Sequence, residues 1–312
     1  MTLGVLGEAA SPPIANRGVY PSVGGVPVPQ FDWYGATVCA HHDAVLDVVE
    51  QALLDAGEDT LRAEGGKVRR YGAITFINDR KGRKLAAVKH GGYPFPHLEA
   101  EGSAAPAVAE ALRATGWVHK PTRIDSCVDI TRPGLLEDLH TIMRQFEDKY
   151  GLHLNYAGAA LDNPERGSTI YLGSRKSQVF LRAYQKGHQL AELQGIDPRS
   201  LSPEMQNWVR VELVFRPDKP HAKAFASAIS PEGVWGVSSW SQEFAKRALS
   251  LNAERVKLTQ RRESDHERAL RHMSVQYRLH LQRLLHDCGG DYAQAFAVLA
   301  DLADLSAPLK AA

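Results

Sequence analysis

The segment from Ser168 to Lys186 constrains the fold most, because polar and apolar residues alternate in two short runs separated by Gly173 and Ser174. Successive side chains of a strand point to opposite faces, so this pattern predicts a β-hairpin with one buried face. Leu181 and Ala183 belong to the buried face. The opposite face of the second strand then carries Phe180, Arg182, Tyr184 and Lys186.

A second alternating segment, residues 123–130, places two acidic residues on one face of a strand. Asp125 and Asp129 share that face with Arg123 and Cys127, while the apolar residues point the other way. Asp is depleted in strands, so two on one face require an explanation. A salt bridge or a turn at the strand end explains either aspartate alone, whereas a metal site explains both.

A third segment, residues 208–216, repeats the pattern and places Arg210 and Glu212 on one face. If both acidic strands lie beside the hairpin, Asp125, Glu212 and Tyr184 converge. Carboxylate oxygens suit Mg²⁺ or Mn²⁺, ions that also bind phosphate oxygens. The three segments therefore predict a divalent metal site beside a phenol.

Tyr184 is distinguished from the other tyrosines by its flanking cations, Arg182 and Lys186. Most tyrosines in a protein have a structural role, with the ring packed against apolar groups and the hydroxyl hydrogen-bonded to water. This structural role is the alternative to a nucleophilic role for Tyr184. Nearby cations favour the phenolate of a group whose pKa is ordinarily about 10. Tyr171, one strand away, is the second candidate nucleophile. No acidic residue occurs between Arg166 and Lys186, and the other basic residues there are Arg175 and Lys176.

Periodicity along the rest of the chain predicts an α+β fold. Predicted strands span residues 31–38, 72–78, 83–89, 97–100, 122–130, 168–172, 177–185 and 208–216. Predicted helices span residues 43–56, 104–115, 135–150, 240–251, 265–286 and 291–305. Each half follows the order strand, helix, strand, strand, which indicates a pseudo-duplicated unit forming an antiparallel sheet with helices on one face. We expect an irregular arm at 1–28, an α+β domain at 29–228 and a C-terminal helical region at 229–312.

Composition limits the functional classes. The 312 residues include 37 Lys+Arg and 36 Asp+Glu, so a role in nucleic-acid binding must depend on local basic clusters. Three scattered cysteines indicate a reducing compartment, and no apolar run has membrane-spanning length. We expect a cytoplasmic protein of a bacterial host. P-loop, dinucleotide-binding and zincin motifs are absent from the sequence.

Histidine is plentiful, with 13 residues, but its spacing predicts no metal site. His41 and His42 are adjacent, which on a strand would send them to opposite faces. No histidine–apolar–histidine triplet occurs. We interpret each histidine as a surface residue or a satisfied core residue.

Taken together, these segments resemble the replication initiation factor family, the rolling-circle initiators of small plasmids and filamentous phages. The resemblance covers about residues 31–223 and is closer to the phage members. Its most specific part is the Gly-Ser-Arg-Lys-Ser block followed by Arg-x-Tyr-x-Lys. The matching segments are Phe31-Asp32-Trp33, Arg123 to Asp129, Thr169 to Ser177, Phe180 to Lys186 and Arg210 to Leu213.

The resemblance implies a specific activity. Members bind a double-strand origin, nick one strand and stay joined to the 5′ end through tyrosine, while the free 3′-OH primes a host polymerase and a host helicase unwinds the duplex. The nicking tyrosine of the family falls on Tyr184. Its acidic metal residues fall on Asp125 and Glu212, with Asp129 as a third, and the ion is Mg²⁺ or Mn²⁺. We further assign transition-state stabilisation to Arg182 and Lys186, and DNA contacts to Arg123, Arg166, Arg175, Lys176 and Arg210.

One departure from the family pattern and two alternatives remain. Plasmid members continue after the tyrosine with a Lys/Glu-rich run, whereas Gly187-His188-Gln189 follows here. A duplicated unit with aromatic residues on its sheet, such as Phe180 or Trp208, is also typical of non-catalytic RNA-recognition modules. A metal nuclease that uses water, without a covalent adduct, is the other alternative. The C-terminal helices are candidates for a homodimer contact.

Overall fold

The described part of the chain comprises residues 27–157, 167–256 and 264–304 of a computed structural model. The chain divides into two compact units, Met1–Thr259 and Gln260–Ala312.

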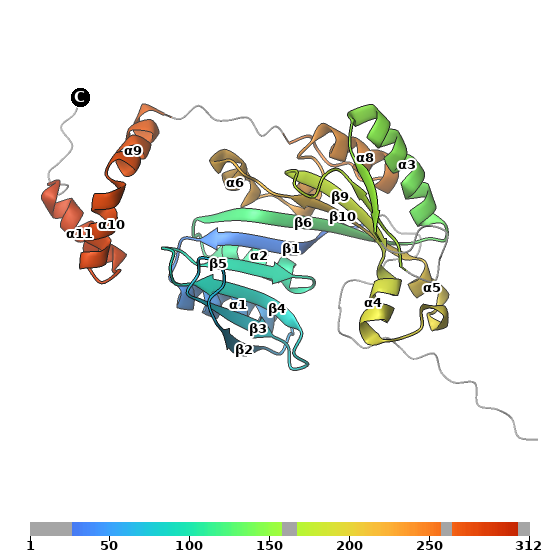
Figure 1. The fold of residues 1–312 in the computed structure, drawn as a ribbon, viewed down its shortest axis with the longest axis horizontal. Coiled ribbons are helices and arrows are strands. Elements are labelled where there is room, and N and C mark those ends of the chain that lie inside the picture. Colours follow the sequence, from blue (N-terminus) through green and yellow to red (C-terminus); the bar gives the residue numbers. More distant parts are fainter. Residues whose placement is uncertain (1–26, 158–166, 257–263, 305–312) are drawn as a thin grey trace, which may run out of the picture. The chain divides into compact units, whose positions relative to one another are not determined.

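The first unit is built on one antiparallel sheet, whose described strands follow the order β2-β3-β4-β5-β1-β6-β10-β9-β8-β7 (Figure 1). The predicted antiparallel α+β architecture is confirmed. The strands are β1 (Gln30–Val38), β2 (Leu61–Gly65), β3 (Ala73–Asn78), β4 (Lys84–His90), β5 (His97–Glu101), β6 (His119–Thr131), β7 (Leu154–Ala157), β8 (Thr169–Leu172), β9 (Val179–Gln185) and β10 (Trp208–Phe215).

The strand order confirms the predicted duplication and extends it. The first five strands lie in the order 2-3-4-5-1, and the second five lie in the equivalent order 7-8-9-10-6. The two halves meet where β1 pairs antiparallel with β6. Each half therefore contains one more strand than the sequence predicted. The missed edge strands β2 and β7 are short and largely exposed, so they carry no alternation between apolar and polar residues.

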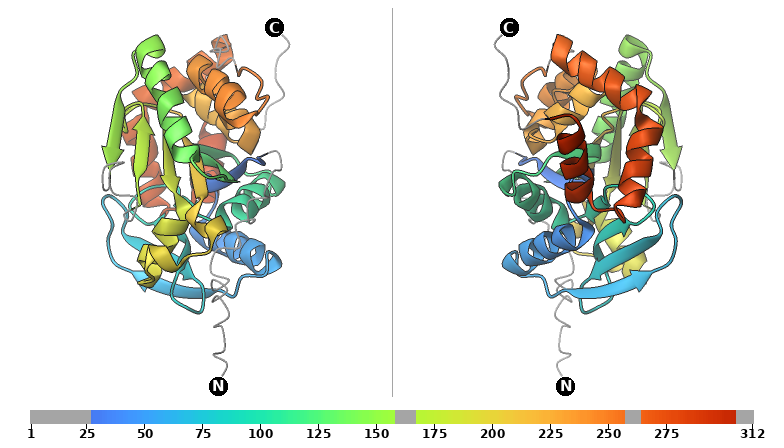
Figure 2. Two further views of the ribbon diagram at one scale, coloured as in Figure 1. Left: turned by 90° about the vertical axis from the view of Figure 1, so that its right-hand side faces the viewer. Right: turned by 90° about the vertical axis from the view of Figure 1, so that its left-hand side faces the viewer.

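Helices cover one face of the sheet, as predicted (Figure 2). Apolar residues from α1–α3 and α6–α8 form one core with the inward side chains of the strands. The helices of this unit are α1 (His42–Asp55), α2 (Ala104–Ala114), α3 (Leu135–Tyr150), α4 (Lys186–Gln194), α5 (Pro203–Gln206), α6 (Pro220–Ala226), α7 (Pro231–Val234) and α8 (Ser239–Leu249). We call the opposite side of β1, β6, β10 and β9, which faces the viewer in Figure 1, the open face.

The first unit extends further along the chain than the α+β domain predicted at 29–228. Helices α7 and α8, assigned from sequence to the C-terminal region, contribute the buried Trp235 and Phe244 to the core of this unit. The indole of Trp235 also donates to Ser126 of β6 at 3.0 Å. These helices therefore belong with the sheet because their apolar sides are buried against it.

The second unit contains α9 (Asp265–Gln276), α10 (Arg278–Asp287) and α11 (Tyr292–Leu302). One long helix was predicted at 265–286, and this was wrong, because the chain leaves helical geometry at Tyr277 (φ −99°, ψ 14°). None of the described residues of these three helices is buried. Separately, no helix in the described part of the chain is long and apolar enough to cross a membrane.

Candidate active site

Strand β9 presents its polar side chains to the open face, as the alternation predicted. Leu181 and Ala183 lie in the core, whereas Arg182 and Tyr184 point to the open face. Register places Arg182 opposite Glu212 of β10 and Tyr184 opposite Arg210. Cross-strand pairing thus brings cations, an acid and the phenol into neighbouring positions.

The hydroxyl of Tyr184 donates a hydrogen bond of 2.5 Å to Oε1 of Glu212. The Tyr184 side chain is 6% exposed, yet it lines a pocket of about 210 Å³ together with Tyr171, Arg182 and Gln189. Burial, and then the negative charge of Glu212, raise the pKa of this phenol well above its usual value. Tyr184 is therefore a neutral phenol whose proton points at a carboxylate.

Glu212 is fully buried and is the acceptor for two partners. Its Oε1 receives the Tyr184 hydroxyl, and its Oε2 receives the guanidinium of Arg182. Burial, followed by repulsion from Asp32 and Asp125, raises the pKa of Glu212 to about 7. A carboxyl with this pKa can exchange a proton with a neighbour near neutral pH.

Asp125 and Asp129 lie on the open face of β6, and each is held by an arginine. Arg123 binds Asp125 through two hydrogen bonds of 2.9 and 2.5 Å. Burial raises the pKa of Asp125, and Arg123 counteracts this effect. Arg210 binds Asp129 through hydrogen bonds of 2.8 and 2.6 Å. Two-point contacts of this kind satisfy both carboxylate oxygens.

The buried Arg210 also donates to Asp32 at 2.7 Å, a residue that the sequence analysis did not assign to the site. A β-bulge in β1 explains this, because Phe31 pairs with Ser126 and Trp33 with Asp125, leaving Asp32 as the extra residue. Bulges redirect side chains, and here Asp32 is turned to the open face. The sequence signal that could have identified Asp32 was its place in Phe31-Asp32-Trp33, one of the segments that match the family.

Lys186 was predicted to continue the strand, but it is the first residue of α4. Its ammonium lies 5.8 Å from the centre of the Tyr184 ring and donates to Gln189 at 3.0 Å. Burial lowers the pKa of Lys186. Helix α4 is seated closely on α5, because a Cβ at Gly187 would lie 1.8 Å from the carbonyl oxygen of Met205. Gly187 stands where plasmid members have a Lys/Glu-rich run. Because it has no side chain, α4 can pack closely on α5, and the first residue of α4, Lys186, lies beside Tyr184.

The carboxylates assigned to a metal ion are a partial fit for one. Their oxygens are the ligands that Mg²⁺ and Mn²⁺ prefer, and Glu212 and Asp125 repel each other's charge. Each is already paired with an arginine, however. In this structure Asp125, Asp129 and Glu212 do not bring one oxygen each within 4.8 Å of one another, so all three could hold one ion only after their side chains rearrange.

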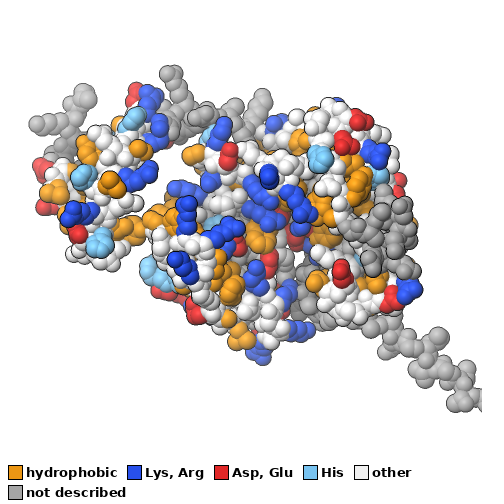
Figure 3. Space-filling model, viewed as in Figure 1, with side chains coloured by type: hydrophobic (Ala, Val, Ile, Leu, Met, Phe, Trp, Pro, Cys, Tyr) orange, Lys and Arg blue, Asp and Glu red, His pale blue; other side chains and the backbone are white. Residues whose placement is uncertain are grey.

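Lysine and arginine side chains gather on the open face (Figure 3), and two arginines there lie over aromatic rings. Arg123 lies 4.5 Å from the ring centre of Trp33, and Arg216 lies 4.9 Å from that of Phe180. Register places Trp33, Asp125, Val214 and Phe180 in one row across four strands. Neither Trp33 nor Arg216 was among the predicted DNA contacts.

The remaining predicted DNA contacts are placed as follows. Arg175 and Lys176 are exposed beyond β8, with Arg175 4.1 Å from the ring centre of Tyr171. Arg166 lies outside the described residues. Trp208, named as a stacking residue, is 4% exposed and donates to Asp129 at 2.8 Å. In the described part of the chain, the hydroxyl of Tyr171 makes no hydrogen bond to a carboxylate, in contrast to Tyr184.

The histidines were all interpreted as structural, yet His41 and His42 form, with Asp43, a group that can hold a metal ion. The two histidines lie at the turn from β1 into α1, not on a strand, so their rings are close together, with centres 4.4 Å apart.

Comparison with known proteins places these residues in context. The family model described as Replication initiation factor matches residues 120–287, more than half of the chain. No curated protein matches significantly. Among solved structures, the chain is similar to a rolling circle replication initiator protein from Geobacillus stearothermophilus, with 17% identity and a TM-score of 0.46, over 74% of this chain and 100% of that chain.

Proposed function

The chain belongs to the replication initiation factor family, and from this premise we propose that it initiates rolling-circle replication by nicking and rejoining one strand of origin DNA through Tyr184. The observation that carries the proposal is the hydrogen bond from Tyr184 to Glu212, next to Arg182. A nucleophile, a base and a phosphate-binding cation are thereby combined on one face of the sheet.

Glu212 is the general base in this proposal. Its raised pKa, about 7, lets it take the phenol proton at neutral pH, which Tyr184 cannot lose unaided because its own pKa is raised. The Tyr184 oxygen then bonds to phosphorus and the bond from phosphorus to the 3′-oxygen breaks. The 3′-oxygen leaves and takes a proton from solvent, Glu212 returns the phenol proton to solvent, and the 5′ end remains as a phosphotyrosine. One phosphodiester replaces another, so the reverse reaction reseals the strand.

Arg182 and Lys186 stabilise the charge that develops on the phosphoryl oxygens. Arg182 is released from Oε2 of Glu212 when the phosphate arrives, because the phosphate offers the guanidinium a competing anion. A Mg²⁺ or Mn²⁺ ion held by Asp125 and by Oε2 of Glu212, the oxygen that Arg182 releases, with Asp129 as a third ligand, would draw further charge from the phosphate and leave Oε1 to accept the phenol proton. Arg210 is buried between Asp32 and Asp129, so its role is to hold the site rather than to contact DNA.

The DNA strand lies across the open face in this proposal. Arg175 and Lys176 contact phosphates beside the pocket, while the half-buried Trp33 ring, under the guanidinium of Arg123, stacks with an unpaired base. Phe180, which the sequence analysis named as a stacking residue, is 5% exposed and lies under Arg216, so it does not stack with a base. Arg123 forms an ion pair with Asp125, and this holds its guanidinium over the Trp33 ring. A melted or hairpin region of the origin fits such a surface better than a duplex, whose bases are already stacked. A host polymerase and helicase then act on the nicked origin.

The test uses a labelled supercoiled plasmid that carries the protein's origin, incubated with Mg²⁺ and analysed on denaturing gels. With the wild type we expect a labelled protein band, which reports the covalent adduct between protein and DNA. Tyr171→Phe is the matched control in the same pocket and should also give this band. Tyr184→Phe removes the band. Nicking that survives both substitutions points to a nuclease that uses water. Binding without nicking, in Mg²⁺ or Mn²⁺, points to a non-catalytic DNA-binding protein, and either result overturns the proposal.

A further inference from the structure

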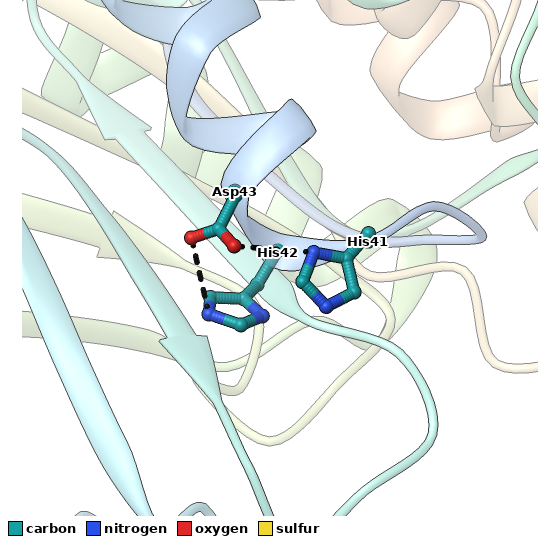
Figure 4. A group of neighbouring side chains, drawn as sticks. All are labelled: His41, His42 and Asp43. Carbon is teal, nitrogen blue, oxygen red and sulfur yellow. Dashed lines mark ion pairs between the residues drawn. The ribbon is translucent and has the colours of Figure 1, made fainter. Parts of the chain in front are cut away.

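A histidine–histidine–aspartate group lies where β1 leads into α1, outside the candidate active site (Figure 4). Nδ1 of His41 and Nε2 of His42 each lie 3.3 Å from a carboxylate oxygen of Asp43. Among the described residues, this is the single group of three histidine, cysteine or acidic side chains whose ligand atoms all lie within 4.8 Å of one another.

The two imidazole nitrogens contact different oxygens of Asp43, and one ligand atom from each of the three residues lies within 4.8 Å of the others. Small rotations of these side chains bring the atoms to the spacing that a tetrahedral metal ion requires. Zinc binds imidazole nitrogen and carboxylate oxygen at about 2.0 Å, which separates neighbouring ligand atoms of a tetrahedron by about 3.3 Å. Two imidazoles with one carboxylate are ligands of zinc and related transition metals, whereas Mg²⁺ prefers oxygen ligands. The donor set therefore favours a different ion from the one proposed for Asp125 and Glu212.

A further histidine supports the position of His42. The ring of His90, at the end of β4, stacks on that of His42 with centres 4.3 Å apart and planes inclined by 7°. Nε2 of His90 is in turn 3.1 Å from the hydroxyl of Thr75, which donates to Glu64. Supporting contacts of this kind hold a ligand ring in one orientation.

The charge of Asp43 is available to an ion. Its partners among the described residues are imidazoles, without lysine or arginine, unlike Asp125, Asp129 and Glu212, each of which is paired with an arginine. His41 and Asp43 are also well exposed, so an ion can reach them from solvent. His41 makes no side-chain cap to α1, and its Nδ1 contacts Asp43, the other residue proposed to bind the ion.

The group is distant from Tyr184. Strand β1 begins beside Cys127 and ends with Val38 beside His119. His119 and Asp125 are six residues apart on β6, which corresponds to roughly 20 Å along a strand, and His41 lies beyond that end. An ion at this position does not contact a phosphate bound at Tyr184.

We propose that His41, His42 and Asp43 bind one zinc ion, or a related first-row transition metal ion, with water completing the coordination. The ion fastens the turn that leads from β1 into α1. This site is separate from the nicking centre and does not depend on the function proposed above.

The test measures Zn²⁺ binding to untagged full-length protein by competition with a chromophoric chelator, without DNA, and in parallel the shift of thermal unfolding with added Zn²⁺. We expect one Zn²⁺ bound per chain and a higher unfolding temperature, because an ion that binds the folded state stabilises it. His41→Ala, His42→Ala and Asp43→Asn should each weaken binding at least tenfold. His153→Ala, an exposed histidine elsewhere, should not.

Added Co²⁺ provides a second readout, because its visible absorption reports tetrahedral coordination, and His42→Ala should abolish this spectrum. Nicking in Mg²⁺, where it occurs, should be unchanged by His41→Ala. The proposal would be overturned if the wild type did not bind Zn²⁺, or if His41→Ala, His42→Ala and Asp43→Asn all bound it as tightly as the wild type. Failure of the zinc proposal can be told from failure of the nicking proposal, because the Zn²⁺-binding, unfolding and Co²⁺-absorption measurements are made without DNA.

Discussion

The hydroxyl of Tyr184 on β9 and the carboxylate of Glu212 on β10 are joined by a hydrogen bond of 2.5 Å in a buried position on the open face. The two residues are 28 positions apart in the sequence and lie on adjacent strands. In the apo protein this contact keeps the phenol protonated and points its proton at the base. In the proposed function, the phenol proton therefore already has an acceptor for the nicking step.

The pH dependence of nicking tests the role of Glu212. Below pH 7 this carboxyl, with its pKa raised to about 7, is protonated and cannot accept the phenol proton. We expect the nicking rate to rise about tenfold per pH unit up to about pH 7 and then level off. Glu212→Gln should lower the rate by about 10²–10⁴-fold and remove this pH dependence. Glu192→Gln, at the exposed rim of the same pocket, should retain the wild-type profile, and a flat profile in the wild type would contradict the assignment.

Removal of Arg210 should destabilise the fold. Arg210→Ala leaves Asp129 and Asp32 without their shared cation in a buried position. Loss of one partner from a buried ion pair costs about 3–5 kcal/mol. Denaturant unfolding should show this loss, whereas Arg175→Ala, an exposed change on the same face, should stay within about 0.5 kcal/mol of the wild type. Equal stability of the two variants would mean that the buried cluster is not as described.

Trp33 should contribute to single-strand binding. Stacking of a base on an aromatic side chain contributes about 1–3 kcal/mol, so Trp33→Ala should weaken binding of a single-stranded oligonucleotide by about 5- to 150-fold. Fluorescence anisotropy with single-stranded and duplex forms of one sequence would measure this. Trp33→Phe keeps an aromatic ring and should restore most of the affinity. Equal losses for single-stranded and duplex DNA would count against stacking.

Gly187 should tolerate no side chain. In Gly187→Ala the new Cβ meets the carbonyl oxygen of Met205, so α4 must move and carry Lys186 away from Tyr184. We expect lower thermal stability and slower nicking. Gly66→Ala is the matched control, because nothing lies within 4 Å of a Cβ built there. Wild-type nicking by Gly187→Ala would show that the position of Lys186 is unimportant.

Lys176 should contribute affinity without sequence preference. It is exposed beyond β8, and a lysine that contacts one phosphate releases about one counterion on binding. Lys176→Ala should therefore reduce the slope of log affinity against log salt concentration by about one for all DNA sequences tested. If the slope of log affinity against log salt concentration were the same for Lys176→Ala and the wild type, the bound DNA would not contact Lys176.

Local pattern in the sequence determined which residues share a face. Alternation in the segments of β6, β9 and β10 was sufficient to separate the core residues from the polar set that includes Asp125, Tyr184 and Glu212, because side-chain direction along a strand depends on the backbone alone. The same information predicted the duplicated antiparallel fold. Family-typical residues near Tyr184 added the expected activity.

Tertiary structure decided what each of those side chains contacts. The pairing of β9 with β10 brought Glu212 within hydrogen-bond reach of Tyr184, diagonally across the two strands. A bulge brought Asp32 to Arg210, and the turn after β1 brought the side chains of His41 and His42 beside Asp43. The first two contacts do not follow from periodicity, because each depends on where a second segment of the chain lies. The third depends on the conformation of the turn itself, which alternation does not describe. The physical reason is that alternation fixes direction, while distance, burial and therefore pKa are properties of the packed structure.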